Sequence, residues 1–156
     1  MEAVYVETTI FSYLAARPSR DLLIAAHQQT THDWWSNRRA VFECVISQAV
    51  YDEAAAGDAD AAARRMVFIK GLPMLEATED AERLARAILE NGAVPMQAAR
   101  DAAHIAIATV NAVEYLLTWN CTHLANAQIM RKVSAVCNAE GFSMPVICTP
   151  EELMGA

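Results

Sequence analysis

The chain has no long apolar run and no leader-like start. No uninterrupted apolar stretch approaches the ~20 residues that a helix needs to cross a membrane, although 54% of the 156 residues are hydrophobic. The first residues do not combine positive charge with an apolar run, which is the pattern of a secretory leader. The sequence therefore predicts a cytoplasmic protein without a membrane segment.

Paired cysteine motifs are also missing. The four cysteines lie far apart and none belongs to a C-x-x-C pair: Cys44, Cys121, Cys137 and Cys148. A zinc site or a redox pair would need closer spacing, so buried and reduced thiols are the better interpretation.

Positive charge is scarce, and the formal net charge is -7. This balance argues against a strong, sequence-independent grip on nucleic acid, because such a grip is built from many Lys and Arg contacts to phosphate. It does not exclude a nuclease. Only Lys70 and Lys132 are lysines, so ten of the twelve basic residues are arginines, which suit bidentate phosphate contacts. The pairs Arg38-Arg39 and Arg64-Arg65 fit either phosphate contacts or solvated helix faces.

Short apolar runs alternate with helical segments along the whole chain, without a repeat, linker or low-complexity segment. Strands are expected at residues 3–6, 42–47, 74–77, 115–118 and 146–148. Parallel strands need a crossover between them, and helices supply it. The sequence therefore predicts one α/β domain over residues 1–156, a three-layer α/β/α sandwich with a parallel sheet. Periodicity leaves the strand order open.

Polar side chains with oxygen ligands stand at or just beyond these strands. Glu7 closes the first strand, and Glu53 lies about a turn and a half into the helix after the second. Asp101 lies in the N-terminal half of an alanine-rich helix, where the macrodipole favours its ionised form and an unpaired carboxylate would be costly. Asn120 follows the fourth strand. Three acids and an amide placed in this way could converge on one pocket.

Each candidate also has an ordinary structural interpretation. Glu7 could be a solvated strand end, because Thr8 or Thr9 is the better N-cap for the following helix. Glu53 could be a solvated helix residue, with Asp52 competing for its role. Asn120 could be the N-cap of a helix that starts at the next residue.

Other polar residues in these segments are candidates for supporting contacts. His104 shares a helix face with Asp101, three residues away, and favours a structural hydrogen bond over metal binding. The residues expected to contact the ligands rather than bind metal are Thr8, Thr118, His123 and Asn126.

Four segments together resemble a known family. They are E-T-T-I-F-S-Y-L from Glu7, S-Q-A-V-Y-D-E-A-A-A-G-D from Ser47, R-D-A-A-H-I-A-I-A from Arg100 and L-L-T-W-N-C-T-H-L-A-N-A from Leu116. This pattern resembles the PIN-domain nucleases, most closely the VapC-type toxins of toxin-antitoxin pairs, over nearly the whole chain. The resemblance implies a five-stranded sheet with adjacent first and fourth strands, which would make Glu7 and Asn120 neighbours.

The resemblance also implies a function. It implies a Mg²⁺- or Mn²⁺-dependent endoribonuclease whose catalytic and metal-binding residues are Glu7, Glu53, Asp101 and Asn120. Phosphodiester hydrolysis assisted by such ions needs hard oxygen ligands, as these residues offer. The implied partners are an RNA substrate, a small antitoxin protein and a second copy of the chain. The family usually has Asp where this chain has Glu7 and Asn120, and the Asn contributes no negative charge toward a second metal.

Two other classes of function stay open. A non-catalytic PIN-like module that binds RNA or regulates, with a degenerate acidic site, would carry the same pattern. A phosphate-accepting receiver domain or a dehalogenase-like phosphatase also places acids at strand ends. Both of these need a catalytic lysine near a late strand, and the only candidates are Lys70 and Lys132.

Overall fold

Five parallel strands form one sheet in the order β3-β2-β1-β4-β5 in the computed structural model, which describes all residues from Met1 to Ala156. The strands are β1 (Ala3–Val6), β2 (Glu43–Ser47), β3 (Met74–Leu75), β4 (Tyr115–Leu117) and β5 (Val146–Cys148). The predicted parallel α/β sheet is confirmed, and β1 and β4 are neighbours as the resemblance implies.

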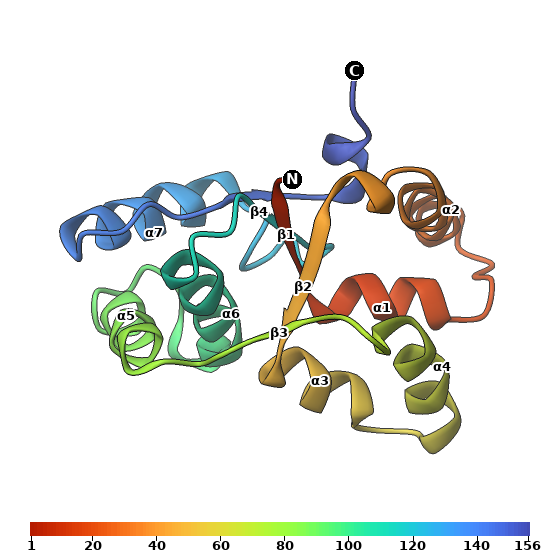
Figure 1. Ribbon diagram of the computed structural model, residues 1–156, viewed down its shortest axis with the longest axis horizontal. Coiled ribbons are helices and arrows are strands. Elements are labelled where there is room, and N and C mark those ends of the chain that lie inside the picture. Colours follow the sequence, from red (N-terminus) through yellow and green to blue (C-terminus); the bar gives the residue numbers. More distant parts are fainter.

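Seven α-helices cover the two faces of this sheet. They are α1 (Thr8–Ala15), α2 (Leu22–Asn37), α3 (Gln48–Ala55), α4 (Ala59–Ile69), α5 (Glu79–Glu90), α6 (Ala99–Val110) and α7 (Ala127–Ala139). Helices α1 to α4 gather on one side of the sheet, and α5, α6 and α7 pack together on the other (Figure 1). The predicted three-layer α/β/α sandwich is therefore confirmed. Short 3-10 turns, which the sequence did not predict, occupy Arg39–Val41, Met96–Ala98 and Pro150–Leu153.

Strand β1 lies at the centre of the sheet and of the core. Val4, Tyr5 and Val6 are completely buried, because helices cover both faces of a parallel sheet and leave no solvent side. No helix combines the length and apolarity that crossing a membrane requires.

Polar side chains cap several of the helix starts. Asp21, Asp58 and Thr78 cap α2, α4 and α5 with their side chains. The prediction that Thr8 or Thr9 caps α1 is wrong, because Glu7 is the N-cap and its carboxylate accepts the Thr9 N–H. Glu7 can do this although Glu is a weak N-cap, since its side chain turns back over the first turn of α1 and is held there by further hydrogen bonds.

Candidate functional site

Glu7 ends β1 with its carboxylate almost completely buried, at 5% residue exposure. Its backbone N–H donates to the Leu117 carbonyl at 3.0 Å, which extends the pairing of β1 with β4 to the edge of the sheet. Its Oε1 accepts hydrogen bonds from the Thr118 hydroxyl at 2.6 Å and the Thr9 hydroxyl at 2.5 Å, and its Oε2 accepts the Thr9 N–H at 3.2 Å. Three of the roughly four acceptor positions of this carboxylate are thus filled.

Glu53 comes to the same place from α3. The Ser47 hydroxyl at the end of β2 accepts the Val50 N–H and caps this helix, so α3 starts at the same edge of the sheet. Glu53 Oε1 accepts the Thr8 hydroxyl at 2.6 Å, while its Oε2 makes no hydrogen bond within the protein. Asp52, the alternative considered from the sequence, is exposed instead and accepts a hydrogen bond from Gln48 of its own helix.

His104 joins these carboxylates from α6. Its side chain is 1% exposed, and its Nε2 lies 2.7 Å from Glu53 Oε1. Its Nδ1 lies 2.7 Å from the Tyr5 hydroxyl, which in turn lies 2.7 Å from the Ser47 hydroxyl. Both ring nitrogens are therefore engaged, in the structural hydrogen-bonding role that the sequence favoured over metal binding.

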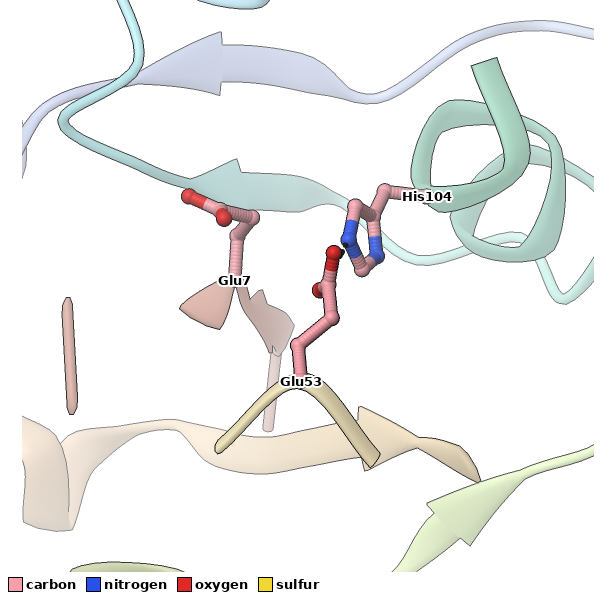
Figure 2. A group of neighbouring side chains, drawn as sticks. All are labelled: Glu7, Glu53 and His104. Atoms are coloured by element: carbon pink, nitrogen blue, oxygen red, sulfur yellow. Dashed lines mark hydrogen bonds and ion pairs between the residues drawn. The ribbon is translucent and has the colours of Figure 1, made fainter. Parts of the chain in front are cut away.

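Figure 2 shows Glu7, Glu53 and His104 reaching the same space from three separate elements. One ligand atom from each of the three lies within 4.8 Å of the others. Because His104 already uses both nitrogens, the metal-binding capacity of this group lies in the two carboxylates.

Asp101 and Asn120 form a second group at the same edge. The Asn120 side-chain NH₂ donates to Asp101 Oδ1 at 3.2 Å, and Asp101 Oδ2 lies 3.3 Å from His123 Nδ1. The Asn120 backbone N–H donates to the Thr118 hydroxyl at 2.9 Å, and that hydroxyl donates to Glu7. Three of the four predicted site residues, Glu7, Asn120 and Asp101, are thus linked by hydrogen bonds through Thr118, whereas Glu53 is not part of this chain of bonds.

The Asn120 amide oxygen is already occupied. It accepts the backbone N–H groups of Thr122 and His123 at 3.2 and 3.0 Å, and so caps a turn rather than a helix. These two bonds use both lone pairs of the oxygen. Its predicted role as a metal ligand stays a prediction, and it would require this oxygen to leave the two N–H groups.

The charges in this network shift the pKa values of its members. Burial raises the pKa of Glu7, although the charge of His104 and the bonds from Thr118 and Thr9 oppose it. For Glu53, burial is outweighed by the hydrogen bond and charge of His104, so the pKa is lowered. For His104, burial is outweighed by the bond to Glu53 and by the charges of Glu7, Glu53 and Asp101, so the pKa is raised. Glu53 and His104 thus each favour the charged form of the other, whereas burial disfavours the charged form of Glu7.

The residues expected to make supporting contacts mostly do so. Thr8 donates to Glu53, Thr118 donates to Glu7, and His123 pairs with Asp101. Asn126 instead caps α7 through the Gln128 and Ile129 N–H groups.

Three contacts were missed from the sequence. Thr9 was considered only as a helix cap, while Tyr5 and Ser47 were counted as strand residues. The available signals were a hydroxyl inside a buried apolar strand and a serine at a strand end.

A cavity of about 300 Å³ opens beside Glu53, between α3 and α6. Small alanine side chains leave its space free, and Arg100 is its only basic lining residue; the lining residues are Ala49, Asp52, Glu53, Ala56, Arg100 and Ala103. The site therefore offers anionic oxygen ligands on one side and a guanidinium on the other.

Comparisons with protein families, with curated proteins and with solved structures found no match. The resemblance to PIN-domain nucleases thus stays a prediction from the sequence.

Proposed function

We propose that this protein is a Mg²⁺- or Mn²⁺-dependent endoribonuclease of the PIN-domain type, acting as the toxin of a toxin-antitoxin pair. The observation that carries the proposal is the buried Glu7 carboxylate within 4.8 Å of Glu53, at the carboxyl edge of a parallel sheet. Such edges are where open α/β proteins bind their ligands.

The charge balance of the network favours a divalent cation. The carboxyl groups of Glu7, Glu53 and Asp101 gather around His104 and help to raise its pKa. Uncompensated buried charge is costly, and the raised pKa of Glu7 reports that cost. A divalent cation would offset the negative charge that these carboxyl groups bring together.

The available oxygen atoms fit a hard cation. Glu53 Oε2 makes no hydrogen bond, Glu7 keeps one acceptor position, and Asp101 has two oxygens each with a single partner. Carboxylate oxygens are the ligands that Mg²⁺ takes in proteins, together with water and phosphate. When bound, the ion would polarise a phosphoryl oxygen and lower the pKa of a bound water.

The other residues hold these ligands in place. Thr9 and Thr118 fix the Glu7 carboxylate, while Thr8 and His104 fix that of Glu53. Arg100, exposed at the cavity beside Glu53, would contact a substrate phosphate.

The test is Mn²⁺-dependent cleavage of RNA by the wild type and by two isosteric variants. Glu53→Gln and Asp101→Asn should each lower the rate at least about 100-fold, as removal of an electrostatic contributor in an active site does. Asp60→Asn is the control, since it changes an exposed carboxylate of α4 that does not line the cavity. Full activity in Glu53→Gln or Asp101→Asn would overturn the assignment of that residue.

A non-catalytic RNA-binding or regulatory module is the second candidate. Asn120 favours it, because an amide stands where the family usually has Asp and both lone pairs of its oxygen are used. RNA binding without any metal-dependent cleavage at stoichiometric protein would select this candidate.

The partners follow from the resemblance alone. We expect a homodimer and a small antitoxin whose helix covers the acidic edge, in the cytoplasm. Analytical ultracentrifugation of the chain alone, and again with the product of the neighbouring reading frame, tests both partners.

A further inference from the structure

Three buried polar side chains, here called the polar row, lie behind Glu53 in the core. They are Ser47 at the end of β2, Tyr5 in β1 and His104 in α6, and these residues are 1%, 0% and 1% exposed. The Ser47 and Tyr5 hydroxyls lie 2.7 Å apart, and the Tyr5 hydroxyl lies 2.7 Å from His104 Nδ1. The row ends at Glu53, whose Oε1 lies 2.7 Å from His104 Nε2.

The groups at the two ends of the polar row determine the direction of its hydrogen bonds. The Val50 backbone N–H can only donate, and it donates to the Ser47 hydroxyl at 3.3 Å. The ionised Glu53 carboxylate can only accept, so His104 Nε2 carries a hydrogen and donates it. With a neutral imidazole, Ser47 donates to Tyr5 and Tyr5 donates to His104 Nδ1, so that every hydrogen has an acceptor. Burial raises the pKa of the Tyr5 hydroxyl, which therefore keeps the hydrogen that it donates.

The polar row starts and ends on the same helix. Ser47 is the N-cap of α3, and α3 carries Glu53. Ser47 is thus connected to Glu53 by two routes, one through the backbone of α3 and the other through Tyr5 and His104. A carboxylate held in this way at its backbone and at its oxygen has less freedom than one held by the helix alone.

The hydrogen bonds to Glu53 leave one of its oxygens free. Oε1 receives both His104 Nε2–H and the Thr8 hydroxyl, the latter at 2.6 Å, while Oε2 makes no hydrogen bond within the protein. Figure 2 shows Glu53 and His104 pointing toward each other from α3 and α6. Because both bonds go to Oε1, Oε2 is the atom available to a ligand.

Core packing alone does not account for the polar row. Val4 and Val6, on either side of Tyr5 in β1, are equally buried and apolar. A phenylalanine would fill the place of Tyr5 without bringing a hydroxyl into the core. Buried polar groups are costly unless every partner is present. The polar row therefore favours a role at the site over a role in packing.

We propose that Tyr5 and Ser47 are positioning residues of the acidic site, which act through His104 to hold Glu53 with Oε2 free for a divalent cation. This inference rests on the proposed function. Loss of a group that orients a metal ligand from behind typically costs about 10- to 100-fold in metal affinity or activity. Tyr5 and Ser47 are enclosed in the core, so neither would touch the cation or the RNA.

The test is isothermal titration of the folded protein with Mn²⁺ in the absence of RNA. Tyr5→Phe keeps the ring and removes only the hydroxyl, so the dissociation constant should rise at least about tenfold. Ser47→Ala removes the first hydroxyl of the row and should also weaken binding. Tyr115→Phe is the matched control and should bind Mn²⁺ like the wild type. It removes a tyrosine hydroxyl from β4, next to β1, where that hydroxyl donates to Glu2 and has no connection to Glu53.

A double-mutant cycle tests whether Tyr5 acts through His104. Tyr5→Phe should change Mn²⁺ affinity in the wild type but not in His104→Gln, because the row is already broken there. In the cleavage assay, Tyr5→Phe should lower kcat and leave the KM for RNA unchanged, since the hydroxyl does not contact the substrate. A purely structural role would instead lower the urea midpoint and leave Mn²⁺ affinity unchanged.

Wild-type Mn²⁺ affinity in folded Tyr5→Phe, or an equal loss of affinity in Tyr115→Phe, would overturn the inference. The inference and the proposed function fail separately. Mn²⁺-dependent cleavage with unchanged Mn²⁺ binding in Tyr5→Phe would reject the positioning role and leave the nuclease. Weakened Mn²⁺ binding in Tyr5→Phe, without cleavage by the wild type, would support the positioning role and reject the nuclease. A wild type that does not bind Mn²⁺ would reject both.

Discussion

Two carboxylate-histidine pairs stand at the carboxyl edge of the sheet, and their histidines differ in burial. Glu53 Oε1 lies 2.7 Å from His104 Nε2, and the two side chains are 21% and 1% exposed. Asp101 Oδ2 lies 3.3 Å from His123 Nδ1, and these side chains are 18% and 28% exposed. His104 uses both ring nitrogens, while His123 lies in the turn after β4 and is partly exposed. The first pair fixes the geometry of the site, and the second leaves its carboxylate free to change partners.

The largest difference should appear when each histidine is removed. His104→Ala leaves Glu53 and the Tyr5 hydroxyl without their partner and opens a cavity in the core. Breaking a buried pair in this way costs about 3–5 kcal/mol. Urea denaturation of the metal-free protein measures the loss in unfolding free energy. A loss below about 1 kcal/mol would show that the pair does not hold the site together.

Asn120→Asp acts on the Asp101–His123 pair, because Asn120 contacts Asp101. The substitution replaces the hydrogen bond from Asn120 to Asp101 by a repulsion, so the metal-free protein should lose about 1 kcal/mol of unfolding free energy. The added charge should tighten Mn²⁺ binding about tenfold, which corresponds to 1.4 kcal/mol. Isothermal titration with Mn²⁺ measures this change against the wild type. An unchanged dissociation constant would place Asn120 outside the metal site.

The pH dependence of stability should also separate the two pairs. Because the pKa of His104 is raised in the folded protein, its stabilising contribution is complete below its unfolded pKa of about 6.5 and is lost as pH rises through the folded pKa. The raised pKa of Glu7 also makes stability fall as pH rises. Comparing the wild type with His104→Gln therefore isolates the contribution of His104. Thermal melts without metal should show a shallower fall with pH in His104→Gln and the wild-type fall in His123→Ala.

His123→Ala should have the smallest effect. A partly exposed pair with His123 Nδ1 3.3 Å from Asp101 Oδ2 contributes about 0–1 kcal/mol, and Asp101 keeps its bond from Asn120. Urea denaturation should therefore give an unfolding free energy within about 0.5 kcal/mol of the wild type. A loss as large as that of His104→Ala would contradict the comparison.

The sequence predicted the sheet well because local patterns determine it. The five strands appear within a few residues of their predicted ranges, since buried parallel strands leave short apolar runs that helices interrupt. Strand order depends on contacts between segments far apart in sequence. It was predicted only from the resemblance to the PIN-domain family. That Glu53 rather than Asp52 turns inward also depended on the resemblance.

The hydrogen bonds of the site could not be predicted in the same way. Whether Glu7 or Thr9 caps α1 depends on Thr118, which lies 111 residues away from Glu7 in sequence. The two bonds that occupy the Asn120 oxygen depend on the turn that follows it. Sequence spacing predicts which residues lie at the carboxyl edge of the sheet. It does not predict which hydrogen-bond partner each hydroxyl or amide group contacts.

The central position of β1 determines when the site can form during synthesis. β1 is made first and can pair with β2, but Glu7 receives its Thr118 hydrogen bond only after β4 has been added. A ribosome adds about 5–20 residues each second and domains emerge from the N-terminus, so a growing chain spends several seconds without Thr118 or Asn120. Through that interval the nascent chain lacks Thr118 and Asn120, so the acidic edge is completed only after most of the chain has been made.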